Sequence, residues 1–130
     1  MSSQKTHLDR LVRIDRINAM IDTLLSQIQD LQHGGNVAPL RCWVARYQVR
    51  SKNKIYWYYK LQSPTPLFLS STLAGRLSKY RHLGKAGSEA HISAVQAVLR
   101  RALIDEVQQT IDTLTQCLLD IDFENEQQDL

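Results

Sequence analysis

The sequence predicts an α+β fold in which two long amphipathic, coiled-coil-like helices flank a small antiparallel β-hairpin or three-stranded sheet. Apolar residues recur at helical spacing near both ends of the chain, a pattern typical of helices that bury one face. Between them, two runs of β-branched and aromatic residues flank a short polar turn, as in a hairpin. The length of 130 residues indicates a single domain over residues 1–130.

The first helix is expected over residues 6–33, with Thr6 as its N-cap and the glycines after His33 as its end. Isoleucine and leucine recur every seven residues in two parallel series, which predicts a coiled-coil seam. The predicted seam residues of this helix are Ile14, Ile17, Ile21, Leu24, Ile28 and Leu31.

A second long helix is expected over residues 88–122, capped by Ser88 and followed by an acidic tail at residues 123–130. Its apolar stripe advances in steps of three and four. A small sheet cannot bury both stripes, so the helices should pair with each other as an antiparallel hairpin, with a second subunit, or both, and a homodimer is favoured. The predicted seam residues here are Leu103, Val107, Ile111, Leu114 and Leu118.

The region 41–85 is expected to form the basic sheet. Its hairpin strands are Cys42–Val49 and Ile55–Leu61, and Arg76–Leu83 is expected to be a third strand rather than a short helix. Alternation gives each strand one face for a core and a second face that is basic, polar or tyrosine-bearing. The tryptophans Trp43 and Trp57 are expected in the core, or where the sheet meets a helix.

The charge distribution indicates the function. The net charge of +3 conceals a block, residues 31–88, that contains ten basic residues and no Asp or Glu. Clustered cations without nearby acids suit phosphate neutralisation, and tyrosines can stack on bases or bond to phosphate. We therefore expect a nucleic-acid-binding protein, with DNA favoured over RNA. The predicted contact residues are Arg41, Arg46, Arg50, Lys52, Lys54, Tyr56, Tyr58, Lys60, Arg76, Lys79, Arg81 and Lys85.

Two other interpretations of the basic block are open. Its lysines could only solvate and protect sheet edges. Alternatively, the chain is a coiled-coil interaction or scaffold protein whose basic face binds an acidic protein partner. The segment 83–89, with two glycines before a helix start, is either a phosphate cradle built from backbone N–H groups or a simple turn capped by Ser88.

The sequence predicts no catalytic residue, metal site, cofactor or small-molecule substrate. The four histidines lack metal-ligand spacing, and His82 is expected on the basic surface. A nucleophilic Tyr80 with cationic neighbours would still need an acid, a metal or a pocket. No apolar run reaches the roughly 20 residues of a membrane span. Without a secretion signal, a cytoplasmic location with reduced Cys42 and Cys117 is expected.

Two short motifs carry a resemblance. The stretches 55–61 (IYWYYKL) and 79–85 (KYRHLGK) resemble an uncharacterised type of small bacterial protein associated with mobile elements. The second stretch and the helix after it are also similar to the three-stranded-sheet DNA-binding domains of phage-type integrases. The resemblance covers residues 42–103. It implies a sheet that enters the major groove, and no catalytic residue, although the proline-rich segment 63–66 and the long helices depart from the integrase pattern.

Overall fold

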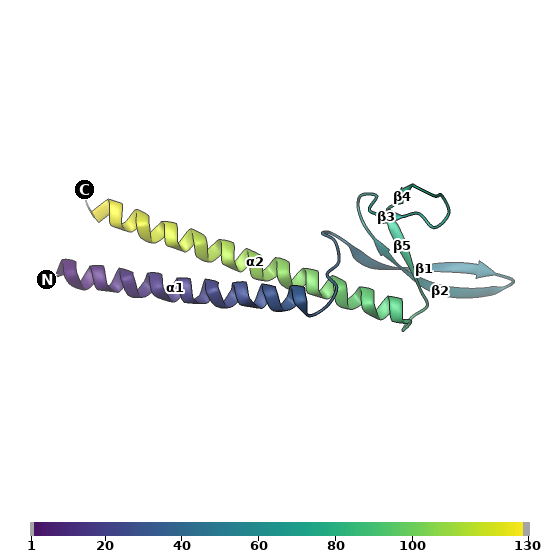
Figure 1. The fold of residues 1–130 in the computed structure, drawn as a ribbon, viewed down its shortest axis with the longest axis horizontal. Helices are drawn as coiled ribbons and strands as arrows, with labels where there is room; N and C mark the ends of the chain where they lie inside the picture. Colours follow the sequence, from purple (N-terminus) through teal and green to yellow (C-terminus); the bar gives the residue numbers. More distant parts are fainter. Residues whose placement is uncertain (1, 129–130) are drawn as a thin grey trace. The chain divides into compact units, whose positions relative to one another are not determined.

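The chain runs from one long helix through five short strands to a second long helix (Figure 1). In the computed structural model, which describes residues 2–128, α1 spans Ser2–His33 and α2 spans Glu89–Gln128. The strands are β1 (Trp43–Ser51), β2 (Lys54–Gln62), β3 (Phe68–Leu69), β4 (Leu77–Ser78) and β5 (Tyr80–Gly84). The predicted α+β class is therefore confirmed.

The chain divides into two compact units, and α2 contributes residues to both. One unit is Gly34–Ala102, which contains all the strands and the start of α2. The other combines α1 with the part of α2 from Leu103 onward.

The sheet unit is organised by a two-residue turn. Strands β1, β2 and β5 form an antiparallel sheet with β2 in the centre, and β3 pairs with β4. Lys52 and Asn53 connect β1 to β2 with φ of 48° and 67°, the left-handed values of a type I′ hairpin turn. This turn places Ser51 opposite Lys54. Since residues opposite one another share a face, odd-numbered residues of β1 lie on the same face as even-numbered residues of β2.

One face of this sheet, which we call the inner face, packs against α2. Leu61 and Leu83 of the sheet form the core with Phe68 and Ala94, and Leu61 is only 1% exposed. Closer to the start of α2, the ring of His91 stacks on Tyr59 at a centroid distance of 4.1 Å. The first turns of α2 are thereby fixed to the sheet.

In the helical unit, α1 pairs antiparallel with the second part of α2 (Figure 1). Arg13, near the start of α1, donates to Glu124, near the end of α2, at 2.8 Å, and also to Asp9 at 3.1 Å. The hydrogen bond from Arg13 lowers the pKa of Glu124, and the same bond raises the pKa of Arg13. Predicted seam residues Leu24 and Ile111 are buried.

Most other seam residues are half-buried, and Leu103 is 43% exposed. The half-buried ones are Ile14, Ile17, Ile21, Ile28, Leu31, Val107, Leu114 and Leu118. The helix pair therefore covers its own apolar stripes only in part.

Element boundaries differ from the predicted ones at three places. Helix α1 begins at Ser2, so Thr6 lies inside the helix and is not its N-cap. Helix α2 continues to Gln128 through most of the predicted acidic tail, because no glycine or proline interrupts it; residues 129–130 of that tail lie outside the described residues. The predicted third strand is confirmed as a strand, but a bend at Lys79 divides it into β4 and β5.

Replacing Leu61 with alanine should destabilise the sheet unit by about 3 kcal/mol, because the cavity lies in the centre of the core. Denaturant titration followed by tryptophan fluorescence measures this directly, since Trp43 and Trp57 both lie in the sheet. The matched control is Leu69→Ala, at a side chain that is 80% exposed, where a change below about 0.5 kcal/mol is expected. Equal destabilisation by both variants would contradict the described core.

Candidate nucleic-acid interface

The face of the β1-β2-β5 sheet opposite the core, which we call the outer face, gathers aromatic side chains from all three strands. The register places Tyr47 opposite Tyr58, and it pairs His82 with Lys60 across β2 and β5. Trp43 and Tyr80 remain 46% and 41% exposed. The residues of the outer face are Trp43, Ala45, Tyr47, Val49, Ser51, Lys54, Tyr56, Tyr58, Lys60, Gln62, Tyr80 and His82.

Four of these rings form what we call the aromatic cluster, namely Tyr47, Tyr58, Tyr80 and His82. The rings of Tyr47 and Tyr58 stack with centroids 6.0 Å apart, and Tyr80 meets His82 edge-on at 5.2 Å. The Tyr47 hydroxyl and His82 Nδ1 share a hydrogen bond of 2.8 Å. Contacts therefore link rings from the outer strands across β2.

A single cation, Lys60, lies within the aromatic cluster. Its Nζ is 5.2 Å from the centroid of Tyr47 and 5.0 Å from that of Tyr80, within cation–π range. Partial burial, followed by the nearby phenols of Tyr58 and Tyr80, raises the pKa of Tyr47. The Tyr47 hydroxyl therefore stays protonated at neutral pH. The cluster offers an ammonium group and phenol hydroxyls to an anion, with flat rings beside them.

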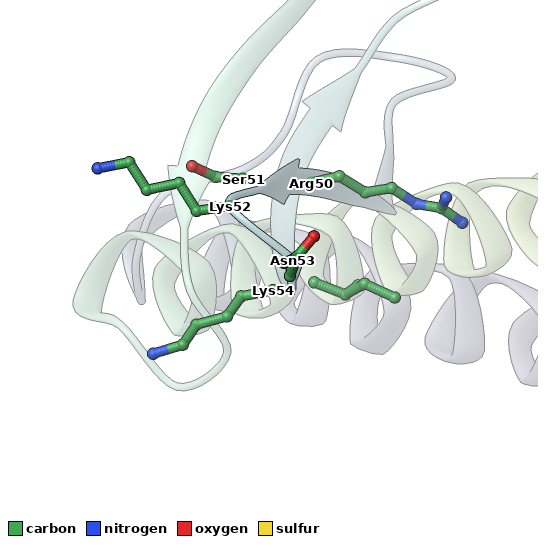
Figure 2. Close-up of a pocket in the computed structure, with 6 residues that line it drawn as sticks. Arg50, Ser51, Lys52, Asn53 and Lys54 are labelled. Carbon is green, nitrogen blue, oxygen red and sulfur yellow. The ribbon is translucent and has the colours of Figure 1, made fainter.

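The tip of the β1-β2 hairpin concentrates further cations. Figure 2 shows the amino groups of Lys52 and Lys54 directed to one side of the hairpin and the guanidinium of Arg50 directed to the other. The hollow drawn there is lined by consecutive residues of this one turn, from Arg50 to Ile55, so it is a surface concavity and not an enclosed site. A surface of this kind suits contact with an extended polyanion rather than capture of a small molecule.

Lys52 adopts a strained backbone conformation at this tip. Its φ of 48° lies in the left-handed region, which disfavours residues with a Cβ by about 1–2 kcal/mol and which glycine adopts freely. A lysine at this position therefore retains a cation at the tip at a cost in stability.

The register corrects the expectation of one continuous basic, tyrosine-bearing face. Arg46 and Arg50 lie on the inner-face side of the hairpin, whereas Tyr56, Tyr58 and Lys60 lie on the outer face. The cause is the two-residue turn, which pairs odd-numbered with even-numbered positions.

The tryptophans were expected in the core, or where the sheet meets a helix, and the first of these expectations was wrong because both side chains are exposed. Trp57 is 41% exposed beyond the buried core, and the guanidinium of Arg46 lies 4.0 Å from its ring centroid. Trp43 lies on the outer face. The hairpin extends past the start of α2 (Figure 1), and Val49 and Ile55 near its tip are 39% and 53% exposed.

The remaining predicted contact residues are distributed around the sheet. Lys85 extends over the ring of Tyr56 at 5.6 Å and so adds a cation at the edge of the outer face. Arg81 lies over Phe68 at 5.4 Å on the inner side. The others lie in connecting segments, namely Arg41, Arg76 and Lys79. Among the described side chains, those of residues 4–124, none of the ten basic residues of the block 31–88 forms a salt bridge.

The glycine-containing segment 83–89 forms a turn and a helix cap. The Ser88 hydroxyl donates to the Leu83 carbonyl at 2.8 Å and accepts from the His91 N–H at 3.2 Å. The Gly87 N–H donates to His91 Nδ1 at 3.0 Å, and both glycines have positive φ. These bonds use backbone donors that a phosphate cradle would need, so the geometry favours the cap that the sequence offered as the simpler alternative.

The groups considered for nucleophilic chemistry at Tyr80 are only partly brought together. Tyr80 and His82 meet on the outer face, whereas Arg81 between them points to the inner face and lies over Phe68. Within the described part of the chain, no three His, Cys, Asp or Glu side chains could hold a metal ion. Cys42 and Cys117 are free thiols. Neither described helix is both long and apolar enough to cross a membrane.

Sequence reasoning omitted Tyr47 and Tyr80 from the predicted contact residues. Tyr47 could not be assigned to the exposed face, because alternation within one strand does not say which of its faces is buried. An even number of turn residues between the strands was the available signal, since it pairs Tyr47 with Tyr58.

Comparisons of this chain with protein-family models, with curated proteins and with solved structures found no match.

Proposed function

We propose that this chain binds nucleic acid through the outer face and the hairpin tip. The observation that carries the proposal is a block of ten cations without an acid in its sequence and, among the described residues, without a salt bridge. Lys60 lies within the aromatic cluster, Lys85 lies over Tyr56 at the edge of the outer face, and Lys54 shares that face at the hairpin tip. An unpaired lysine can replace a counterion on a phosphate without first losing a carboxylate partner.

The rings of the outer face favour nucleic acid over an acidic protein partner. An acidic protein needs only the cations, and it would gain little from several tyrosines grouped around Lys60. Bases can stack on these rings while the phenol hydroxyls bond to phosphate. The alternative of a scaffold protein draws its support from the exposed apolar residues of the helices, such as Leu8 and Leu99.

The hairpin tip provides the test of the electrostatic part of this proposal. The double variant Lys52→Gly, Lys54→Ala removes two charges, and glycine at position 52 relieves the left-handed strain, so weaker binding cannot result from a less stable turn. The slope of log affinity against log salt should fall by roughly 0.7–0.9 for each phosphate that the variant no longer neutralises. Fluorescence anisotropy with labelled oligonucleotides at several salt concentrations measures it.

The matched control is the double variant Lys5→Ala, Arg16→Ala, which removes the same charge from exposed positions of α1. Its salt slope should equal that of the unaltered chain. Unchanged affinity and slope in the tip variant, or an equal loss of affinity in the α1 variant, would show that net charge rather than this surface governs binding.

We also propose that the helices form a homodimer. Ile92, Val95 and Leu99 follow one another at helical spacing on α2 and are 46%, 43% and 56% exposed. They lie apart from Ala94 and Ala97, which are buried. A second helix would remove this apolar surface from water.

Sedimentation equilibrium should give twice the mass of the chain, and Leu99→Asp should shift the mass toward the monomer because the dimer would bury its charge. Leu69→Asp, at an exposed apolar residue of β3, is the control and should leave the mass unchanged. A monomeric mass at every concentration would exclude the dimer.

A further inference from the structure

We infer that the aromatic cluster binds unpaired bases, so that the ligand of the outer face is a single-stranded nucleic acid rather than a closed duplex. This inference rests on the proposed function and names its substrate class.

Tyr47 and His82 meet above the central strand of the sheet. Its hydroxyl lies 2.8 Å from His82 Nδ1, although β2 separates the two strands that carry these residues. Neighbouring strands are about 4.8 Å apart, so the backbones of β1 and β5 are separated by roughly twice that distance. A side chain perpendicular to the sheet could not make this bond. Tyr47, His82 or both must therefore lean over β2, so their rings together span the middle of the outer face.

The rings of the aromatic cluster contact one another and form a continuous surface. The planes of Tyr47 and Tyr58 differ by 29°, with centroids 6.0 Å apart, so the rings are in contact and leave no slot between them. His82 and Tyr80 extend this surface onto β5. Successive bases of a flexible strand can stack on such a platform, and every base has a π face to offer.

The outer face has few side chains of the types that read base edges in a duplex. In a closed duplex the bases are stacked on one another, and a protein in a groove reaches only their edges. Edge recognition uses mainly Arg, Lys, Asn and Gln, and the strand residues of these types on the outer face are Lys54, at the hairpin tip, and Lys60 and Gln62. Arg46 and Arg50, which could pair with guanine, belong to the other side of the hairpin. A base can stack on the rings of the aromatic cluster only when it is unpaired and exposed.

The experiment compares three ligands of equal length at one salt concentration: a mixed-sequence single strand, the same strand without bases, and the closed duplex. Fluorescence anisotropy with the full chain should show the single strand bound at least about tenfold more tightly than the abasic strand, since each stacked base contributes about 1–3 kcal/mol. The duplex should also bind more weakly than the single strand. This comparison needs no variant, so no folding defect can imitate its result.

Single substitutions test whether the bases stack on the aromatic cluster. Tyr47→Leu and Tyr58→Leu should each weaken single-strand binding about tenfold and leave abasic-strand binding nearly unchanged. Tyr47→Phe keeps the ring and should retain most of the affinity. The matched control is Trp57→Leu, which removes an exposed ring from the opposite side of the hairpin and should have little effect.

The outcomes separate this inference from the proposed function. Duplex binding as tight as single-strand binding, equal binding of the abasic strand, or equal losses of affinity in Trp57→Leu and Tyr47→Leu would each overturn the inference while nucleic-acid binding stands. No binding of any of the three ligands at low salt would overturn both.

Discussion

The register of the β1-β2 hairpin is the constraint on which the rest of the sheet unit depends. A turn of two residues, Lys52 and Asn53, places odd positions of β1 beside even positions of β2. A slip by one residue would turn every side chain of one strand to the other face. Leu61 would then leave the core, and Tyr58 and Lys60 would leave the outer face. One turn thus sets both the buried surface and the candidate interface.

Burial on one side lets the other side remain polar and aromatic. The core of Leu61, Leu83, Phe68 and Ala94 fixes the sheet to the start of α2. Because that packing stabilises the inner face, the outer face need not bury apolar side chains. The antiparallel sheet can therefore expose tyrosines around Lys60, as antiparallel sheets with one solvated face commonly do. The left-handed backbone of Lys52 costs stability, and this cost is tolerated at a position that presents a cation at the hairpin tip.

The sequence predicted the helices and the hairpin, but it did not predict which face of each strand is buried. Heptad spacing predicted both helices, and β-branched runs around a polar turn predicted the hairpin, because these patterns are local. The end of α2 was missed because nothing local stops that helix before the described residues end. The facing of Tyr47 and Trp43 was missed because it depends on pairing between strands, which alternation within one strand does not fix. Lys60, Tyr56 and Tyr58, which share the outer face, were predicted to share one surface with Arg46 and Arg50, which lie across the sheet from them.

The most direct test is to map a bound oligonucleotide onto the two faces of the sheet by NMR, through the aromatic and methyl resonances of the chain. If the outer face is the interface, titration with a single strand shifts the ring resonances of Tyr47, Tyr58, Tyr80 and His82. The methyl groups of Leu61 and Leu83, in the core, should change little. Shifts confined to Trp57 and its neighbours on the inner side of the hairpin, or to the helices, would contradict the assignment of the outer face as the binding surface.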